Sequence, residues 1–320
     1  MKTIYRLIIL LVVLSISLIG CTSKKNDSND KPIVYLIVKT TDNPFFIEIQ
    51  KGVSDNIMHK YSLMVRGGKD ESDVKNQMQV LESIIEDVNS KKKNIGGVIL
   101  TPASSGGELI PYIKRLVKEG IPVILVDTRI DKNILDNNRV TIPFIGSSNK
   151  QGGKQAADLI TSLLPKGGRV LVLNGVTGQE TAEQRFEGFM GALNLYQNKN
   201  NINYKLTVRT ANWRRSEALK IVSGLYAFGN EFNGIFAAND EMAMGAYQAV
   251  SEIKNKKLPI IIGFDAVKEA VDAVKSKKLT ATIAQSPYKM GKEAIFLIDK
   301  MKNNEKYESE LLINTELIQQ

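Results

Sequence analysis

The sequence of 320 residues contains one cysteine, one histidine and one tryptophan. A single cysteine excludes any disulfide bond within the chain. The one histidine, His59, and the one cysteine form no cluster that would bind a metal or activate a nucleophile, and we interpret His59 as structural. The glycines near residue 168 lack the ordered G-x-G-x-x-G of a dinucleotide site. We therefore predict that the protein is not an enzyme and uses neither a metal nor a cofactor.

Long hydrophobic runs are also scarce, and the longest is the thirteen-residue run 7–19. A run of this length is short for a membrane span, which needs about 20 residues, and it follows Lys2 and Arg6 as in a signal peptide. The end of the run, "LIGC", resembles the lipobox of bacterial lipoproteins. We therefore predict a lipoprotein signal peptide at 1–20 and lipidation of Cys21, with an uncleaved membrane anchor as the alternative.

Negative charge is in the minority, since the formal net charge is +9 for the whole chain. Removal of 1–20 takes away Lys2 and Arg6 and leaves +7. The remaining lysines are scattered and are not interleaved with aromatic residues, which is typical of solvated helix ends and turns. We therefore expect no nucleic-acid partner. Residues 21–31 are polar and without apolar periodicity, so they are predicted to form a flexible tether.

Short apolar runs alternate with segments of helical spacing along the rest of the chain. The runs are 33–38, 97–100, 122–126, 169–174, 234–238 and 259–264. This alternation is typical of βαβ units, and strands that are apolar throughout are buried on both faces of a parallel sheet. Because 320 residues exceed one ordinary core, we predict an α/β protein with two doubly wound lobes.

Polar residues follow these strands, at the sheet edge where open α/β sheets bind ligands. They include Asp127, Asn239, Asp265 and Gln285, and "NPFF" at 43–46 follows the first strand. Several have a structural alternative, because Asn43, Asp240 and Asp265 each precede a helical pattern and fit the N-cap position. Arg129 and Arg185 fit surface ion pairs equally well, and Trp213 fits a core position.

Five segments together resemble one family, the periplasmic sugar-binding proteins of the ribose-binding type. They are "NPFF" (43–46), "RFEGF" (185–189), "FAANDEMAMGA" (236–246), "IGFDA" (262–266) and "ATIAQSP" (281–287). The resemblance implies a type I periplasmic binding protein fold, with two parallel-sheet lobes joined by a three-strand hinge. It places 32–147 and 286–313 in the N-terminal lobe, and 148–285 and 314–320 in the C-terminal lobe.

The resemblance also implies a set of ligand-binding positions, to which we add Lys39. They are Lys39, Asn43, Phe45, Phe46, Asp127, Arg129, Arg185, Trp213, Asn239, Asp265 and Gln285. Aromatic rings suit the apolar faces of a sugar, and carboxylates, amides and guanidinium groups suit its hydroxyl rim. Thr128 separates Asp127 from Arg129, so either Thr128 or Arg129 faces the ligand. In "FAANDEMAMGA" we expect Asp240 to cap the helix and Asn239 to face the cleft.

The function implied by the resemblance is binding of a monosaccharide outside the cytoplasm. We expect a pentose, such as ribose or D-xylose. Trp213 departs from the ribose binders, which commonly have phenylalanine there, and is similar to binders of xylose or galactose, which often have tryptophan. The expected partner is the membrane permease of an ABC importer. The alternative is a sugar-sensing co-receptor that signals to a membrane histidine kinase or chemoreceptor. In both cases Cys21 would attach the protein to the cell membrane through its lipid.

Overall fold

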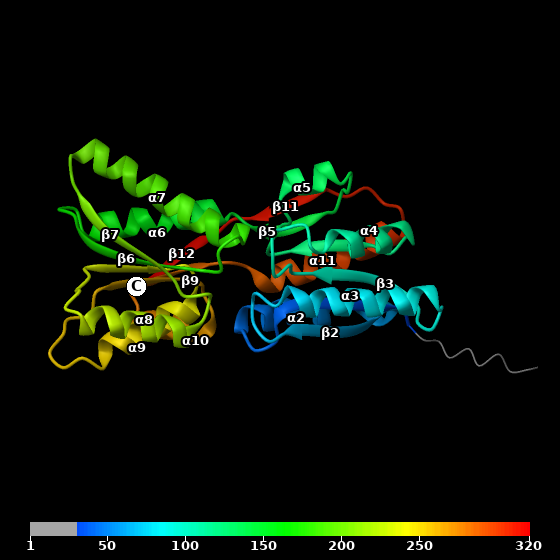
Figure 1. Ribbon diagram of the computed structural model, residues 1–320, viewed down its shortest axis with the longest axis horizontal. Helices are drawn as coiled ribbons and strands as arrows, with labels where there is room; N and C mark the ends of the chain where they lie inside the picture. The colour runs from blue at the N-terminus through cyan, green and yellow to red at the C-terminus, as the bar shows by residue number, and fades with distance from the viewer. Residues whose placement is uncertain (1–30) are drawn as a thin grey trace, which may run out of the picture. The chain divides into compact units, whose positions relative to one another are not determined.

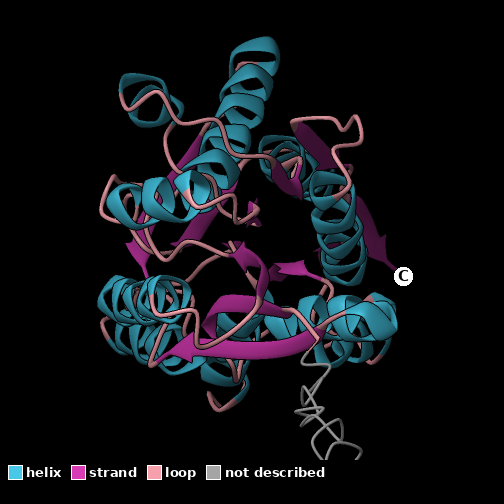
Figure 2. Ribbon diagram, turned by 90° about the vertical axis from the view of Figure 1, so that its right-hand side faces the viewer, coloured by secondary structure: helices cyan, strands magenta, loops and turns pink. Residues whose placement is uncertain are grey.

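Two six-stranded sheets, each covered by helices on both faces, organise the chain (Figures 1 and 2). They are seen in a computed structural model that describes residues 31–320. The predicted signal peptide at 1–20, Cys21 and nearly all of the predicted tether lie outside the described residues. The predicted fold class, two doubly wound α/β lobes, is confirmed.

The first sheet has the strand order β11-β5-β4-β3-β1-β2, and all of its pairs are parallel. Its strands are β1 (Ile33–Thr40), β2 (Ser62–Gly68), β3 (Ile95–Leu100), β4 (Val123–Val126), β5 (Phe144–Ser147) and β11 (Glu310–Ile313). The accompanying helices are α2 (Pro44–Asn56), η1 (Met58–Lys60), α3 (Val74–Asn89), α4 (Ile110–Lys118), α5 (Lys132–Asn137) and α11 (Pro287–Lys302).

The second sheet has the order β12-β10-β9-β8-β6-β7 and is parallel except for the antiparallel pair of β10 with β12. Its strands are β6 (Gly168–Asn174), β7 (Tyr204–Thr210), β8 (Gly234–Ala237), β9 (Ile260–Asp265), β10 (Ala281–Ala284) and β12 (Glu316–Gln319). Its helices are α6 (Asn149–Leu163), α7 (Glu180–Asn200), α8 (Arg215–Ala227), α9 (Asp240–Ser251) and α10 (Lys268–Lys275).

The core of each lobe follows from the alternation of side chains along a strand. In β1, Leu36 packs toward α2 and α11, whereas its neighbour Ile37 packs toward α3 and α4 on the other face. In β8, Phe236 packs with α6 and α7, and Ile235 packs with α8 and α9. Both faces are apolar, which is why the central strands of these sheets are almost entirely hydrophobic.

The chain passes between the two sheets at three places. It leaves the first sheet after β5, returns after β10 when α11 packs on the first sheet, and crosses again between β11 and β12. Because both sheets contain parallel strands with short loops at their carboxyl ends, polar residues that follow β1, β4, β9 and β10 are available to a common site.

Candidate functional site

A small cavity lies at the carboxyl ends of the strands and is lined by residues of both lobes. Ten of the eleven predicted site residues line it. They are Lys39, Asn43, Phe45, Phe46, Asp127, Arg185, Trp213, Asn239, Asp265 and Gln285. Glu71 and Thr181, which were not predicted, complete the wall.

On the side of the first sheet, a buried ion pair forms part of the wall. Lys39, at the end of β1, places Nζ 3.0 Å from Oδ2 of Asp127, and both side chains are at most 5% exposed. The Thr128 hydroxyl donates to the same carboxylate oxygen at 2.8 Å. Asp127 has a φ of 66°, which turns the backbone sharply after β4. The pair leaves Asp127 Oδ1 and the remaining ammonium protons of Lys39 available to a ligand.

On the side of the second sheet, Arg185 of α7 is held by four groups. Its Nε donates to Asn149 Oδ1 at 2.8 Å, and its Nη1 donates to the Ala238 carbonyl at 2.6 Å. Nη1 also lies 3.5 Å from Asp265 Oδ1, and the guanidinium carbon lies 3.8 Å from the centre of the Phe264 ring. These contacts fix a buried positive charge at the cavity wall.

Aromatic rings supply the apolar surfaces. Phe45 and Phe46 meet edge to face, with ring centres 5.4 Å apart and an interplanar angle of 81°. Trp213, from the other lobe, is 4% exposed and has a φ of 65°. A Cβ atom at Gly175 would lie 2.0 Å from Cζ2 of Trp213, so only glycine at this position leaves room for the indole. The position of the indole therefore depends on the absence of a side chain at Gly175.

Two positions, Arg129 and Thr128, differ from expectation. Arg129 lies outside the cavity, where Nη2 is 2.5 Å from Glu310 Oε1 and the guanidinium carbon is 4.1 Å from the centre of the Phe144 ring. Thr128 is fully buried and also does not line the cavity. Arg129 and Thr128 are therefore left out of the ligand set proposed below, because their polar groups are directed to protein partners.

The expected capping of α9 was wrong. Asn239, not Asp240, is the N-cap, since its side-chain oxygen accepts from the Met242 N–H at 2.9 Å. The fully buried Asp240 instead accepts from the Val267 N–H and the Thr282 hydroxyl. Asn239 caps the helix and lines the cavity at the same time, because only its oxygen is needed for the cap. Asn43 does likewise, accepting from the Phe45 N–H while it donates to Glu71.

Two polar atoms of the cavity wall are available to a ligand. Thr181 Oγ1 and Gln285 Oε1 are buried and form no hydrogen bond with any described residue. Buried polar groups without partners are uncommon in folded proteins, and a ligand is one way of satisfying them. Thr181 lies four residues before Arg185 on α7, so helical spacing from the predicted arginine is the signal that would have found it.

We expect Thr181→Val to reduce ligand affinity by about 3- to 10-fold, the effect of one lost hydrogen bond. The same change should leave the free energy of unfolding without ligand unchanged or slightly higher, because it removes an unpartnered buried hydroxyl. Calorimetric titration and urea denaturation measure the two quantities. Thr161→Val is the matched control, since Thr161 is similarly buried on a helix but donates to the Asp158 carbonyl away from the cavity. Equal affinities for both variants would contradict a ligand contact at Thr181.

Two carboxyl groups of the cavity wall have raised pKa values. Burial raises the pKa of Glu71 to about 7, against the opposing effects of Lys39 and of the hydrogen bond from Asn43. Burial likewise raises the pKa of Asp265 to about 7, against the opposing effects of Arg185 and Gln285. Burial also raises the pKa of Asp240. The buried cavity wall therefore disfavours additional negative charge.

A dependence of stability on pH follows from these shifts. Between about pH 4 and pH 7 the folded protein holds protons on Glu71 and Asp265 that the unfolded chain has released, so the free energy of unfolding should fall as pH rises. Carboxyl groups with lowered pKa values, such as Glu269, have largely finished titrating by pH 5.5 in both the folded and the unfolded chain. We expect urea denaturation to show higher stability at pH 5.5 than at pH 7.5, by about 1 kcal/mol or more. Asp265→Asn should flatten the dependence, and a stability that rises over this range would contradict the assignment.

Comparison with known proteins places the chain among solute-binding proteins. Residues 34–306 match the model of the periplasmic binding protein domain. The chain is 32% identical to the ribose import binding protein RbsB of Haemophilus influenzae, over 89% of this chain and 90% of that protein. It is 25% identical to the D-ribose/D-allose-binding protein of Pseudomonas aeruginosa, over 84% and 81% of the two chains.

A solved structure has the same architecture. The periplasmic solute-binding protein of an ABC transporter from Actinobacillus succinogenes, crystallised with bound D-allose, is 29% identical with a TM-score of 0.81. The match covers 90% of this chain and 98% of that one. Within residues 31–320, no helix is long and apolar enough to cross a membrane, and no three metal-binding side chains of His, Cys, Asp or Glu are grouped.

Proposed function

Because this chain belongs to the periplasmic sugar-binding protein family of the ribose-binding type, we propose that it binds a monosaccharide in the cavity between its lobes. The observation that carries the proposal is the composition of the cavity wall. Aromatic rings from both lobes enclose a space rimmed by carboxylate, amide and guanidinium groups, two of whose polar atoms have no partner among the described residues. Sugars present the complementary pattern of apolar faces and a polar rim.

The ligand positions of this proposal are the ten predicted residues that line the cavity, together with Glu71 and Thr181. Lys39, Asp127, Arg185 and Asp265 form charge-assisted hydrogen bonds to ring hydroxyls, which are stronger than bonds between neutral groups. Phe45, Phe46 and Trp213 pack against the sugar. No step of bond making or breaking is assigned to these groups, since the protein acts as a receptor and not as an enzyme.

Within the sugars, a pentose such as ribose or D-xylose is the proposed ligand. The ribose-binding relative supports it, and a hexose adds an exocyclic hydroxymethyl group that needs room and a hydrogen-bond partner. The relative from Actinobacillus succinogenes holds D-allose, a hexose, so the two classes need direct comparison. A thermal-shift screen of D-ribose, D-xylose, D-allose, D-galactose and D-glucose makes that comparison. A sugar at 100 times its dissociation constant adds about 2.7 kcal/mol to the stability, and a larger shift with a hexose than with both pentoses would contradict the pentose.

The proposed role is delivery of the sugar to the membrane permease of an ABC importer. Closing of the lobes about the three connecting segments would bury the sugar and present the closed form to the permease. A deletion strain should lose uptake of the radiolabelled sugar and regain it with the intact gene. Unchanged uptake together with loss of sugar-induced transcription would instead favour the sensing role.

The proposed location is the outer face of the cell membrane, with the protein attached through a lipid on Cys21. The support is the short apolar run that ends in "LIGC". Cys21→Ala should accumulate as an unprocessed precursor without acyl label. Normal processing and labelling of that variant would contradict the anchor while leaving the binding proposal untouched.

A further inference from the structure

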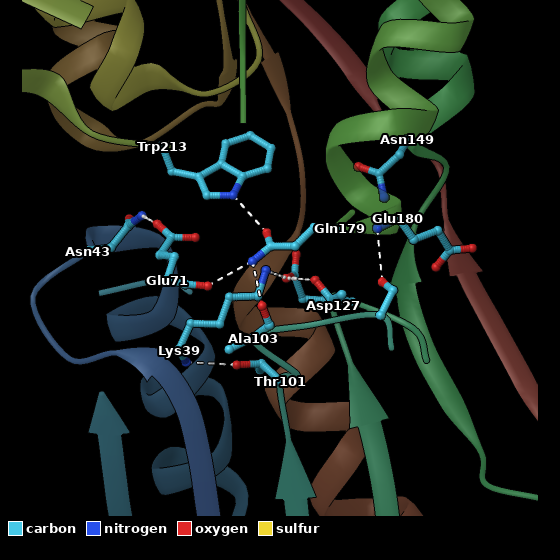
Figure 3. Close-up of polar contacts among 12 residues, drawn as sticks. Lys39, Asn43, Glu71, Thr101, Ala103, Asp127, Asn149, Gln179, Glu180 and Trp213 are labelled. Carbon is cyan, nitrogen blue, oxygen red and sulfur yellow. Dashed lines mark hydrogen bonds and ion pairs between the residues drawn. The ribbon is translucent and has the colours of Figure 1, made fainter. Parts of the chain in front are cut away.

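Gln179 links the two lobes without lining the cavity (Figure 3). Its Nε2 donates to the Glu71 carbonyl at 2.7 Å and to the Ala103 carbonyl at 2.8 Å, both in the lobe of the first sheet. Its Oε1 accepts from Trp213 Nε1 at 2.7 Å, in the lobe of the second sheet. Gln179 itself belongs to the second lobe and is 1% exposed. One side chain therefore joins the indole of the cavity wall to the backbone of the opposite lobe.

The partners fix which end of the amide faces which lobe. Carbonyl oxygens need a donor and the indole N–H needs an acceptor, so the NH₂ group must face Glu71 and Ala103 and the oxygen must face Trp213. Both N–H groups of the amide are used. Gln179 occupies the N-cap position of α7, but its side chain makes no capping hydrogen bond. Its hydrogen bonds go instead to the two lobes.

Other contacts also join the two lobes, but they do not involve Trp213. The Glu180 N–H donates to Ser105 Oγ at 2.9 Å, and Arg214 pairs with Asp70 at 2.6 Å on a partly exposed surface. The exposed pair is screened by solvent and contributes little. Separation of the lobes breaks the two bonds from Gln179 to the first lobe, whereas its bond to Trp213 stays within one lobe.

We propose that Gln179 is a positioning residue that couples lobe closure to the orientation of Trp213 and thereby sets how long a sugar stays bound. The proposal rests on the proposed sugar-binding function. With the lobes closed, the amide holds the indole against the ligand and locks the first lobe at the same time. The bridge therefore acts mainly on dissociation of the sugar, because association precedes closure.

Gln179→Glu removes the two hydrogen bonds to the first lobe but keeps the hydrogen bond from Trp213. A carboxylate still accepts from Trp213 Nε1, but it turns an acceptor toward the Glu71 and Ala103 carbonyls, which disfavours closure. A negative charge at the N-terminus of α7 is favourable for the helix, so folding of the second lobe should be retained. Gln320→Glu is the matched control, since Gln320 also donates to two backbone carbonyls, Val274 and Lys275, but within one lobe.

The test measures sugar kinetics by stopped-flow fluorescence, which reports on Trp213 because it is the only tryptophan in the chain. The probe is whichever of D-ribose, D-xylose, D-allose, D-galactose and D-glucose binds the wild type most tightly. For Gln179→Glu we expect dissociation to be on the order of 10- to 100-fold faster, from two lost hydrogen bonds, with association changed by less than about threefold. Gln320→Glu should match the wild type, and an unchanged dissociation rate in a folded Gln179→Glu protein would overturn the proposal.

A second variant and a measurement without sugar distinguish failure of the Gln179 bridge from failure of the proposed sugar binding. Gln179→Ala removes both halves of the bridge without adding charge, and it should speed dissociation to a similar degree and also shift the Trp213 emission of the sugar-free protein. If the wild type binds none of the five sugars, the proposed function fails. The bridge is then judged by acrylamide quenching of Trp213, which should be stronger in Gln179→Glu than in the wild type. Equal quenching would overturn the bridge.

Discussion

Replacing Arg185 by methionine is expected to lower sugar affinity at least 100-fold and to lower the free energy of unfolding by about 3 kcal/mol. The guanidinium group is buried, lies 3.5 Å from Asp265, and donates to Asn149 and to the Ala238 carbonyl. Its removal leaves a buried carboxyl group without its positive partner and leaves two acceptors unpaired. Calorimetric titration and urea denaturation measure the two effects.

Arg129→Met is the matched control for this prediction. Arg129 was predicted from the sequence alongside Arg185, but it lies outside the cavity and pairs with Glu310. Arg129 also lies 3.5 Å from Glu180 of the other lobe. Its loss should still change sugar affinity by less than about threefold, because both ion pairs are partly exposed. The account is contradicted if Arg129→Met weakens binding as strongly as Arg185→Met, since Arg129 would then act at the ligand.

Replacing Trp213 by alanine is expected to reduce sugar affinity by about 100-fold while the protein stays folded. The change removes one aromatic wall of the cavity, and loss of a large aromatic group from the centre of an interface typically costs 2 kcal/mol or more. It also leaves Gln179 Oε1 without its donor. Calorimetric titration measures the loss, because the variant contains no tryptophan whose fluorescence could be followed. Wild-type affinity in Trp213→Ala would move the binding site elsewhere.

Trp213→Phe and Gly175→Ala divide this effect into its causes. Phenylalanine keeps a ring but loses the bond to Gln179, so its affinity should lie between those of the wild type and Trp213→Ala. Alanine at position 175 places a methyl group 2.0 Å from the present position of the indole, so the ring must move. Gly175 does not line the cavity, and weaker binding in Gly175→Ala would therefore come from displacement of Trp213.

The central strands of both sheets were predictable because they are buried on both faces. β1, β3, β4, β6, β8 and β9 each coincide with one of the predicted apolar runs. The sheet edges gave no such signal. β2 and β7 lie at edges and are mostly half-buried or exposed, and β11 and β12 are four-residue edge strands. β5 is interior but has only four residues, one of them glycine, so its apolar run is too short to stand out.

The site residues that follow these central strands were predictable as well. Most follow a predicted strand, so the general rule for ligand sites in α/β sheets located them. Glu71 follows β2, an edge strand that the apolar pattern did not mark, and its loop brings it to Asn43. The cap of α9 was assigned to Asp240 instead of Asn239 because both residue types are good N-caps. Only the spatial neighbours, Val267 and Thr282, show what Asp240 does.

The bridge through Gln179 had no sequence signal at all, since glutamine in a loop has no periodicity and no typical spacing. Its role depends on groups from distant parts of the chain, Glu71, Ala103 and Trp213, that meet only when the lobes are together. Contacts of this kind require tertiary structure. They hold the two lobes together, and local sequence patterns do not show which residues of one lobe meet the other.

The most direct test of the sugar-binding cavity is a crystal structure of the protein grown with the sugar that gives the largest thermal shift. We predict a single sugar between Phe45 and Phe46 on one side and Trp213 on the other, with hydroxyl groups within 3.2 Å of Thr181 Oγ1 and Gln285 Oε1. Those two atoms are the buried polar atoms of the cavity wall that have no partner among the described residues. A sugar bound outside this cavity, or one inside it that leaves both atoms unpaired, would contradict the account.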